Sequence, residues 1–567
     1  MQPRKRECER VLEKKRLNFV SKTALWLLSF LLVAAGTPVW SGYISLIAAA
    51  VGFAIFWRFL LCFPRPAMRF FQATLWFTLV QLCQLSWFIS HPYHYIYSVW
   101  FSLALLMGIQ WGLLGLAVYP ALFKSLSRLA AIASLWVLLE WSRLWLLSGF
   151  PFNPVGLALS GALYPLQFAA IGGVYGLSFW VIGTNLLALR AWIYPSTRGW
   201  TLFISALLLP YIFGWLHVEY HQRQAADSTD RLSLLLVQPN FPSEESLVFP
   251  DSASARGYVL GEWRALIRLL ANQTGQATDL IALPEYVVPY GTSYAIYPLS
   301  EVSSLFRPFF PDAAWSFPPF QPPYAERIQL EEDGPARWFV SNAFIAQTLA
   351  NLADSYLVIG LEDSSGGGVG KRRLSYSAAL HFSPNGHAVE GYAKQILVPM
   401  GEYIPFEWCR SLAARYGIYG SFTAGQEACV FPHPRPFSAC ICYEEIYGHL
   451  MRQGRVKGAE FLLNLTNDGW YPTLVWHHFF HARLRTVENG VPLARACNTG
   501  ITAACDSLGR IIAFLEPPDP QADPAALRVE LPAYHYATLY TFWGDGFVLY
   551  MSLFFILTRL SAFFYKL

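Results

Sequence analysis

Charged side chains are scarce in this chain of 567 residues. Asp, Glu, Lys and Arg make up 14% of it, against about 25% in an average soluble domain. Acidic residues are nearly missing from residues 23–217, which contain eight Lys or Arg and the single acid Glu140. Hydrophobic residues make up 54% of the chain. This composition excludes an ordinary cytosolic protein.

The charges that are present divide the chain into three parts. Residues 1–22 hold eight Lys or Arg against three Glu, whereas the residues after 217 hold 25 basic and 33 acidic side chains. The only basic cluster lies in 1–22, beside the first apolar run, as is typical of a segment next to a membrane surface. We therefore expect a basic tail, a membrane block and a mildly acidic globular block, and no nucleic-acid partner.

Long apolar runs follow one another through the middle part of the chain. A run of roughly 18 or more apolar residues predicts a transmembrane helix. A basic segment precedes the short first run, so a cleavable signal peptide is an alternative there, but the spans that follow favour an uncleaved start. The eight predicted spans are residues 23–39, 43–63, 70–90, 96–123, 129–148, 166–191, 200–217 and 546–565.

Basic residues in the short loops predict the orientation of these spans, because cytoplasmic loops are enriched in Lys and Arg. The alternate loops 40–42, 91–95 and 149–165 contain neither residue. Every basic loop therefore lies on the side of the tail, which places both termini in the cytoplasm and residues 218–545 outside it. The basic residues that decide this lie in the tail and at Arg65, Arg69, Lys124, Arg128 and Arg198.

Two charges interrupt the fifth span, Glu140 and Arg143 in LLEWSRLWLLSGFPF. Opposite charges three residues apart on a helix can neutralise each other inside a bundle. Ionisable groups within a membrane are also commonly functional, and these two could contact a substrate that passes from the bilayer to the outer block. Both interpretations remain open.

The outer block has an α/β pattern. Short apolar runs that end in turn residues predict buried strands, and they alternate with helical stretches such as WHHFFHARLRTVEN. Strands that alternate with helices indicate a layered α/β domain. The predicted strands are RLSLLLVQPN, DLIALPEY, YLVIGLED, SYSAALHFSPNG, FSACICYEE and AEFLLNLTND.

Three expected strand ends carry reactive side chains: Glu285 in LPEY, Lys394 in YAKQILVPMGEY and Cys442 in ICYEE. A cysteine nucleophile needs a base to form its thiolate, which a Glu could supply. A Lys could stabilise both the thiolate and a tetrahedral oxyanion. The pattern alone also fits a buried structural cysteine, because free Cys is among the most buried residue types.

Several longer motifs decide between these interpretations by resemblance. They are EWSRLWLLSGFPFNPVG, GGVYGLSFWV, LLLVQPN, LPE, YAKQILVPMGEYIPFE, ICYEEIYG, LTNDGWY and RACNTGITAACDSLG. The segments around Glu285, Lys394 and Cys442 resemble the signatures of the nitrilase (carbon–nitrogen hydrolase) superfamily. Together with eight spans, the whole set resembles the apolipoprotein N-acyltransferase family of bacterial inner membranes. This resemblance implies a nitrilase-like α-β-β-α sandwich domain joined to a bundle of eight transmembrane helices.

The resemblance also implies a role for each residue of the site. Glu285 would be the general base, Lys394 the stabiliser of the tetrahedral intermediate and Cys442 the nucleophile. The supporting positions would be Glu402, Tyr443 and Glu444.

The implied reaction is a ping-pong acyl transfer without a metal or organic cofactor. Cys442 would take the sn-1 acyl chain of a phospholipid such as phosphatidylethanolamine. The thioacyl enzyme would then pass that chain to the α-amine of a diacylglyceryl-cysteine apolipoprotein.

The domain boundaries and location follow from the same reasoning. We expect a cytoplasmic tail (1–22), seven transmembrane helices (23–217), an extracytoplasmic catalytic domain (218–540) and a last transmembrane helix (541–567). The resemblance implies a multi-pass protein of the bacterial inner membrane with a periplasmic catalytic domain. We expect it to act as a monomer among membrane lipids.

Two segments depart from the family pattern. Residues 295–340 read as an insertion, and its part 306–324, FRPFFPDAAWSFPPFQPPY, is either a lid or membrane-dipping arm or a packed Pro-rich insertion. The family often has a Trp soon after its VQ-N segment, where this chain offers only Leu247 and Phe249.

A histidine pattern and the cysteines need separate consideration. His477, His478 and His481 form HHxxH on a predicted helix, which resembles a metal site, but without further ligands we expect packing histidines and no metal. The outer block contains six cysteines, some of which could pair in an oxidising compartment. We expect the Cys442 thiol to be free, because a disulfide would abolish its activity.

An acyltransferase with an acceptor other than a lipoprotein is one alternative, and two other functions also remain. A membrane-tethered amidase would use the same three residues with water as the acceptor, although such an enzyme needs one anchor rather than eight spans. A transporter or channel with an inactive nitrilase-like domain is the second of these two functions. The intact Glu285, Lys394 and Cys442 and the lack of an evident inverted repeat argue against it.

Overall fold

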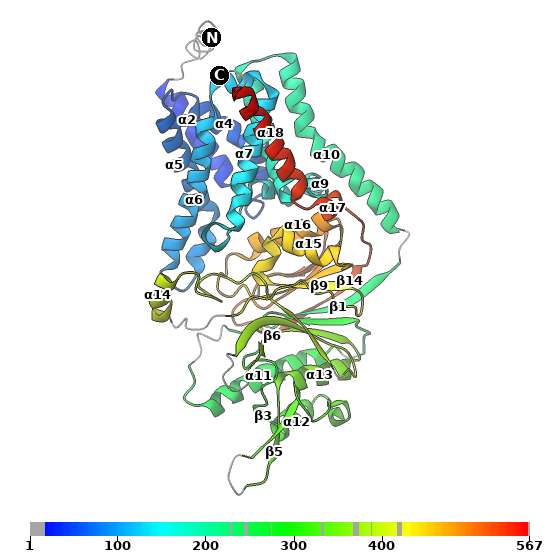
Figure 1. Ribbon diagram of the computed structural model, residues 1–567. Coiled ribbons are helices and arrows are strands. Elements are labelled where there is room, and N and C mark those ends of the chain that lie inside the picture. Colours follow the sequence, from blue (N-terminus) through cyan, green and yellow to red (C-terminus); the bar gives the residue numbers. More distant parts are fainter. Residues whose placement is uncertain are drawn as a thin grey trace. The chain divides into compact units, whose positions relative to one another are not determined.

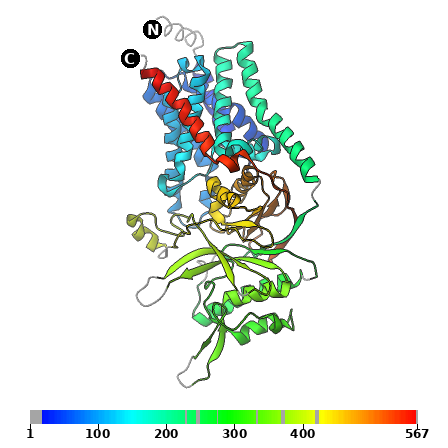
Figure 2. The same ribbon diagram turned by 45° about the vertical axis from the view of Figure 1, so that its right-hand side comes forward.

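The computed structural model has two compact units (Figures 1 and 2). The first comprises Met1–Asp227, Trp476–Gly490 and Ala537–Leu567, and the second comprises Ser228–Val475 and Val491–Tyr536. Most of the predicted basic tail and the terminal Lys566 lie outside the described residues, as does Leu247. The described residues are 18–226, 229–242, 248–273, 275–329, 334–366, 373–386, 388–416 and 422–564.

The first unit is helical, and a helix occupies each of the eight apolar runs (Figure 1). These are α2 (Phe19–Ala34), α3 (Gly42–Ile47) continued by η1 (Ala48–Gly52) and α4 (Phe53–Leu60), α5 (Pro66–Gln84), α6 (Ile96–Ala117), α7 (Leu126–Trp141), α9 (Ala169–Ile193), α10 (Thr197–Ala226) and α18 (Gly546–Phe564). Shorter segments are η2 (Ser86–Ser90), η3 (Pro120–Lys124), η4 (Ser142–Leu144), η5 (Leu146–Ser148), η6 (Val155–Gly161), α8 (Leu163–Leu166) and α17 (Leu539–Trp543).

Four helical stretches among the described residues are long and apolar enough to cross a membrane: Gly42–Leu60, Ile96–Ala117, Ala169–Ile193 and Thr197–Ala226. Phe19–Ala34 and Gly546–Arg559 are apolar but shorter. The structure therefore has several apolar helices in its N-terminal region, and the number of eight spans stays a prediction.

Small residues allow α5 and α6 to pack closely. A Cβ atom at Gly108 would lie 2.0 Å from the Thr78 hydroxyl, and one at Gly112 would lie 2.2 Å from the Thr74 hydroxyl. Helices in a membrane associate through such small residues, because lipid supplies no hydrophobic drive between them. Trp111 of α6 is fully buried in an aromatic cluster that continues beyond this contact.

One helix of the first unit, α16 (Val475–Asn489), comes from far along the sequence. Helix α9 has a break at Gly172 and Gly173, where φ of Gly173 is +62°. The next amide, Val174 N, donates to the Glu488 carboxylate of α16 over 2.8 Å, and Arg485 pairs with the same carboxylate at 2.5 Å. Glu488 therefore supplies an acceptor for an amide that the broken helix leaves without one.

The second unit contains two large sheets (Figure 1). The six-stranded sheet has the order β14-β1-β2-β6-β7-β8, with parallel pairs among β1, β2 and β6. Its strands are β1 (Arg231–Gln238), β2 (Leu280–Leu283), β6 (Tyr356–Ser365), β7 (Leu374–Phe382), β8 (Val389–Ala393) and β14 (Ala525–Pro532). The five-stranded sheet has the order β13-β12-β11-β10-β9 and comprises β9 (Phe437–Ile441), β10 (Phe461–Thr466), β11 (Leu493–Cys497), β12 (Thr502–Cys505) and β13 (Ile511–Leu515).

The two sheets share an apolar core. On β1, Leu234 and Leu236 point into the core between the sheets, whereas Leu235 and Val237 point into a second core against α11 (Ser252–Ala271) and α13 (Asn342–Ala353). Both faces of β1 are thus covered, which explains its continuous apolar run. With α15 (Gly448–Val456) on the five-stranded sheet, the second unit forms the predicted nitrilase-like layers. All six predicted strands are present.

The predicted insertion forms a small subdomain of the second unit. It contains α12 (Leu299–Phe306), η8 (Ala313–Ser316) and an antiparallel sheet of β3 (Tyr297–Pro298), β5 (Arg337–Val340) and β4 (Ala325–Ile328). The aromatic residues of 306–324 mostly pack on the core beside α13: the rings of Phe317 and Phe344 lie 5.0 Å apart. Trp315, in contrast, is 89% exposed. The remaining helical segments are η9 (Glu407–Cys409), α14 (Arg410–Arg415) and η10 (Cys442–Ile446).

Candidate active site

Three strand ends bring the predicted reactive residues together in the second unit. Glu285 follows β2, Lys394 follows β8 directly, and Cys442 follows β9. The Lys394 ammonium donates to Glu285 Oε1 over 2.9 Å, and the charges of both residues act on the pKa of the Cys442 thiol. Residues 109 and 48 positions apart in the sequence therefore meet where the two sheets face each other.

A glycine allows Glu285 to reach this position. Gly360 lies on β6 beside the end of β2, and its amide donates to Pro284 O over 3.2 Å. A Cβ atom at Gly360 would lie 2.5 Å from Glu285 Cα and 2.6 Å from Pro284 O. Because Cβ atoms do not approach other heavy atoms so closely, only glycine fits here without moving the segment that carries Glu285.

Cys442 sits in a strained turn. Its φ angle is +49°, in the left-handed region that residues other than glycine adopt at a cost, often at functional sites. Asn464 of β10 donates to the Cys442 carbonyl oxygen over 3.4 Å, and the thiol lies 4.0 Å from Asn467 O. The thiol is not part of a disulfide.

Burial and charge determine the protonation states at the site. Burial raises the pKa of Glu285, against the opposing charge of Lys394. Burial would lower the pKa of Lys394, but the carboxylates of Glu285 and Glu402 outweigh it and hold that pKa well above its ordinary value. Burial, together with the charge of Glu285, raises the pKa of Cys442 far above its ordinary value. The resting site therefore contains a neutral thiol, an ammonium and a carboxylate that can accept the thiol proton.

Glu402 and Glu444 hold the parts of this site in place. Glu402 Oε1 accepts from Lys394 Nζ over 2.8 Å, and its Oε2 accepts from Val398 N over 2.7 Å. Glu444 accepts from Ile441 N, next to Cys442. The same carboxylate accepts, at the end of β8, from Tyr392 Oη and from the Gln395 and Ile396 amides. Glu444 thus ties the turn that carries Cys442 to the segment that carries Lys394.

Tyr443, the third predicted supporting residue, lies next to Cys442. Its side chain is mostly buried and its ring packs edge-on against that of Tyr447, with the centroids 5.3 Å apart. Burial raises the pKa of the Tyr443 hydroxyl well above its ordinary value, so the hydroxyl is neutral.

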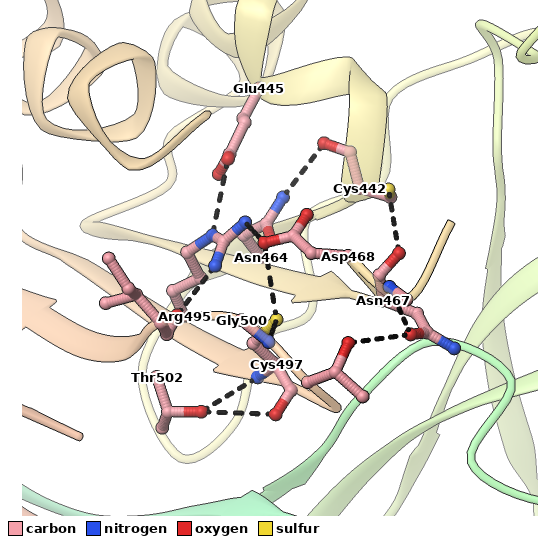
Figure 3. A network of polar contacts seen from close by, with 12 residues as sticks. Cys442, Glu445, Asn464, Asn467, Asp468, Arg495, Cys497, Gly500 and Thr502 are labelled. Atoms are coloured by element: carbon pink, nitrogen blue, oxygen red, sulfur yellow. Dashed lines mark hydrogen bonds and ion pairs between the residues drawn. The ribbon is translucent and has the colours of Figure 1, made fainter. Parts of the chain in front are cut away.

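A second polar network lies behind Cys442 and was not identified from the sequence (Figure 3). Arg495 of β11 contacts Glu445 at 3.3 Å and Asp468 at 3.1 Å, and all three side chains are at most 1% exposed. In the sequence, this network is visible only as a charged residue inside the apolar run PLARAC and as two polar residues at the end of the apolar run FLLNLTND. Nothing in that pattern showed that they would meet.

The structure places Glu140 and Arg143 in the first unit. They pair at 3.9 Å with both side chains 2% exposed. Glu140 also accepts from Val155 N over 2.8 Å, and Arg143 donates to Gln110 over 2.7 Å. These contacts lie within the helical unit, and a role in substrate contact stays a prediction.

The three histidines of HHxxH also lie in the first unit, on α16. All three rings pack against Phe152, with centroids 5.3–6.4 Å from it, and His477 hydrogen-bonds with Asn153. Among the residues that the structure describes, no group of three or more His, Cys, Asp or Glu is arranged to hold a metal ion.

Two family models and several relatives match the chain. Residues 246–521 match the family model of carbon–nitrogen hydrolases, and residues 28–187 match that of the apolipoprotein N-acyltransferase N-terminal domain. The apolipoprotein N-acyltransferase of Chlamydia pneumoniae is 32% identical over 92% of this chain and 93% of its own length. That of Chlamydia trachomatis serovar D is 30% identical over 95% of this chain and 97% of its own length.

A solved structure also aligns with part of the chain. Saccharomyces cerevisiae Nit3, a member of the nitrilase superfamily, matches 55% of this chain and 93% of its own, with 18% identity and a TM-score of 0.33. The assignment itself rests on the two family models and on the relatives that are similar along nearly the whole chain. The chain therefore belongs to the apolipoprotein N-acyltransferase family of bacterial membrane proteins, with a carbon–nitrogen hydrolase domain that follows an N-terminal helical region.

Proposed function

We propose that this protein transfers a fatty acyl chain from a phospholipid to the N-terminal α-amine of a diacylglyceryl-cysteine lipoprotein. The acyl chain comes from the sn-1 position of a phosphatidylethanolamine-like donor and passes through a thioester on Cys442. The observation that carries the proposal is the Lys394 ammonium, which contacts Glu285 at 2.9 Å and Glu402 at 2.8 Å beside a free cysteine.

The first half of the reaction acylates the enzyme. Glu285 accepts the proton of Cys442, and the thiolate attacks the ester carbonyl carbon. Lys394 stabilises the negative charge that develops on the carbonyl oxygen, because its pKa keeps it protonated throughout. The tetrahedral intermediate then expels the lysophospholipid alkoxide, which takes the proton back from Glu285.

In the second half of the reaction, the acceptor amine is the nucleophile and Cys442 is the leaving group. The α-amine of the acceptor attacks the thioester carbon, and Lys394 again stabilises the oxyanion. The Cys442 thiolate leaves, and Glu285 takes a proton from the amine and returns it to the sulfur. Each half transfers one proton to Glu285 and back, so the cycle needs no cofactor.

The lipid nature of both substrates explains why the catalytic domain is joined to apolar helices. Moving an acyl chain from a bilayer into water costs about 0.8 kcal/mol per CH₂ group. We infer eight transmembrane helices, with residues 1–22 in the cytoplasm, 23–217 and 541–567 in the membrane, and 218–540 as a periplasmic domain in the bacterial inner membrane. We further propose that the protein works as a monomer.

The transfer reaction tests the proposal. The full-length protein is incubated with phosphatidylethanolamine and a fluorescent diacylglyceryl-cysteine peptide, and the N-acylated peptide is measured. We expect acylation by the wild type and by Cys429→Ala, a matched control because Cys429 lies outside the site, and none by Cys442→Ala.

Two results contradict the proposal. If the thioester forms but water is the only acceptor, the enzyme is a hydrolase of the amidase type. If Cys442→Ala transfers the acyl chain as the wild type does, Cys442 is not the nucleophile.

A further inference from the structure

Arg495 is a buried cation at the centre of a network that joins three strand ends of the five-stranded sheet (Figure 3). Its Nε lies 3.3 Å from Glu445, and one terminal nitrogen lies 3.1 Å from Asp468. The other terminal nitrogen donates to Ile501 O over 2.6 Å. One planar guanidinium therefore binds three separate segments of the chain.

Two of these segments form the surroundings of the nucleophile. Glu445 belongs to η10, the turn that begins at Cys442, and Asp468 follows Asn467, whose carbonyl oxygen lies 4.0 Å from Cys442 Sγ. Arg495 thus connects the turn that carries the thiol with the loop that the thiol faces. Because its hydrogen bonds go to Glu445, Asp468 and Ile501, we expect Arg495 to affect the reaction through the segments that these residues belong to.

Contacts other than those with Arg495 also hold the loop after β10 in place. The Asn467 side chain accepts from Gly469 N over 3.1 Å and from Asn498 over 3.3 Å. A Cβ atom at Gly500 would lie 2.1 Å from Asp468 Oδ2, so only glycine leaves room for the Asp468 carboxylate there. The position of Asp468, and of Asn467 before it, is therefore closely defined.

We propose that Arg495 is a positioning residue, which clamps the Cys442 turn to the loop after β10 and so sets the orientation of the thiol for attack. This inference rests on the proposed function, because it concerns the same nucleophile. The strain at Cys442 makes such a clamp necessary: a residue held at φ +49° persists only when its surroundings fix it. Displacing a reacting atom by about 1 Å can slow a reaction roughly 100-fold.

Lysine cannot replace Arg495 in this arrangement. A guanidinium presents five donors in a rigid plane, whereas an ammonium is a point charge on a flexible stem. Arg495→Lys keeps the charge that balances Glu445 and Asp468 but cannot reach three segments in fixed directions. Removing the charge altogether would take away the cation that the buried carboxylates of Glu445 and Asp468 contact, which is strongly destabilising, so Arg495→Lys is the more informative variant.

Two rates measured on the full-length protein test the clamp. The first is the acylation of Cys442 by phosphatidylethanolamine in a single turnover, and the second is the alkylation of Cys442 by iodoacetamide as a function of pH. For Arg495→Lys we expect acylation to slow by roughly 10- to 100-fold, with the phospholipid concentration for half-maximal rate unchanged. Arg528→Lys is the matched control, because Arg528 also donates to three acceptors, Gln273, Ala277 and Thr278.

The alkylation profile distinguishes positioning from a purely structural role. The charged groups that affect the Cys442 thiol are Glu285, Lys394 and Asp468, and the Asp468 charge raises its pKa. Weakening the pair between Arg495 and Asp468 leaves more of that charge uncompensated, so the Arg495→Lys profile should shift to higher pH. Alkylation needs no lipid, so this readout remains valid even if phosphatidylethanolamine does not acylate the wild type, a result that would contradict the proposed function alone.

The proposal is overturned if folded Arg495→Lys acylates at the wild-type rate with an unchanged alkylation profile. If Arg495→Lys does not fold, Glu445→Gln replaces it, because the amide keeps the shape and the acceptor oxygen of the carboxylate while it weakens the charged contact with Arg495. Slower acylation by folded Glu445→Gln supports the clamp, and an unchanged rate contradicts it.

Discussion

At the scale of single residues, the site depends on a lysine between two carboxylates. Glu285 and Glu402 each lie within 2.9 Å of the Lys394 ammonium, which is almost fully buried. A buried ammonium without partners would lose its proton, but here two negative charges keep it protonated. One of the two carboxylates can then act as a base while the other holds the lysine in place.

The acylation rate should therefore depend on pH through Glu285. Protonated Glu285 cannot accept the thiol proton, so the rate falls as the pH drops through its pKa. Because burial raises that pKa, the fall should occur above the range of an ordinary glutamate, about 4.3.

Single-turnover acylation measured across the acidic range checks this prediction. Glu285→Gln should abolish the fall in rate at acidic pH and slow the reaction by roughly 100- to 10,000-fold. If the rate falls only at the pH of an ordinary glutamate, burial does not raise the pKa of Glu285.

At the scale of elements, strand ends and the close contacts between them create the site. Glu285, Lys394 and Cys442 follow the ends of β2, β8 and β9, and Gly360 on the neighbouring β6 leaves room for the Glu285 backbone. The position of the base is therefore determined by the contact between β2 and β6 as much as by its own sequence.

Replacing Gly360 by alanine should impair acylation more than folding. The new Cβ atom would lie 2.5 Å from Glu285 Cα, so the base moves and the rate falls by roughly tenfold or more. Gly261→Ala on the exposed face of α11 is the control, since no atom lies within 4 Å of its Cβ.

Thermal unfolding and single-turnover acylation of both variants would be compared. Gly261→Ala should keep the wild-type rate and gain up to about 1 kcal/mol of stability from helix propensity. A wild-type rate in Gly360→Ala would mean that this contact does not position Glu285.

The elements themselves were largely predictable from the sequence, but their long-range contacts were not. The strands were evident because both faces of strands such as β1 are buried, which produces continuous apolar runs. The strands that were not predicted are β3, β4, β5, β8, β11, β12, β13 and β14; of these, β3, β4 and β5 are short and lie in a Pro-rich segment without alternation. Arg495 was missed because its partners Glu445 and Asp468 are 50 and 27 residues away. The resemblance to a family supplied the roles of Glu285, Lys394 and Cys442, which spacing alone did not.

At the scale of the whole molecule, the distribution of Lys and Arg predicts how the chain crosses the membrane. Arg198, in the first turn of α10, belongs to the basic side, and the chain continues from α10 into the second unit. This orientation predicts that residues after α10 lie in the periplasm.

Reporter fusions check the orientation. A phosphatase that is active only in the periplasm should be active when fused after Asp230 and inactive when fused after Ser196, between α9 and α10. A fluorescent protein that matures only in the cytoplasm should give the opposite pattern. Phosphatase activity of the fusion after Ser196 would show that the topology is the reverse of the predicted one and that the catalytic domain lies in the cytoplasm.

The central claim is that Cys442 carries the acyl chain. The most direct measurement is the intact mass of the full-length protein after incubation with phosphatidylethanolamine, beside Cys442→Ala. We expect a mass increase of one acyl chain that hydroxylamine removes and that Cys442→Ala lacks. The absence of any adduct, in wild-type protein whose Cys442 reacts freely with iodoacetamide, would contradict it.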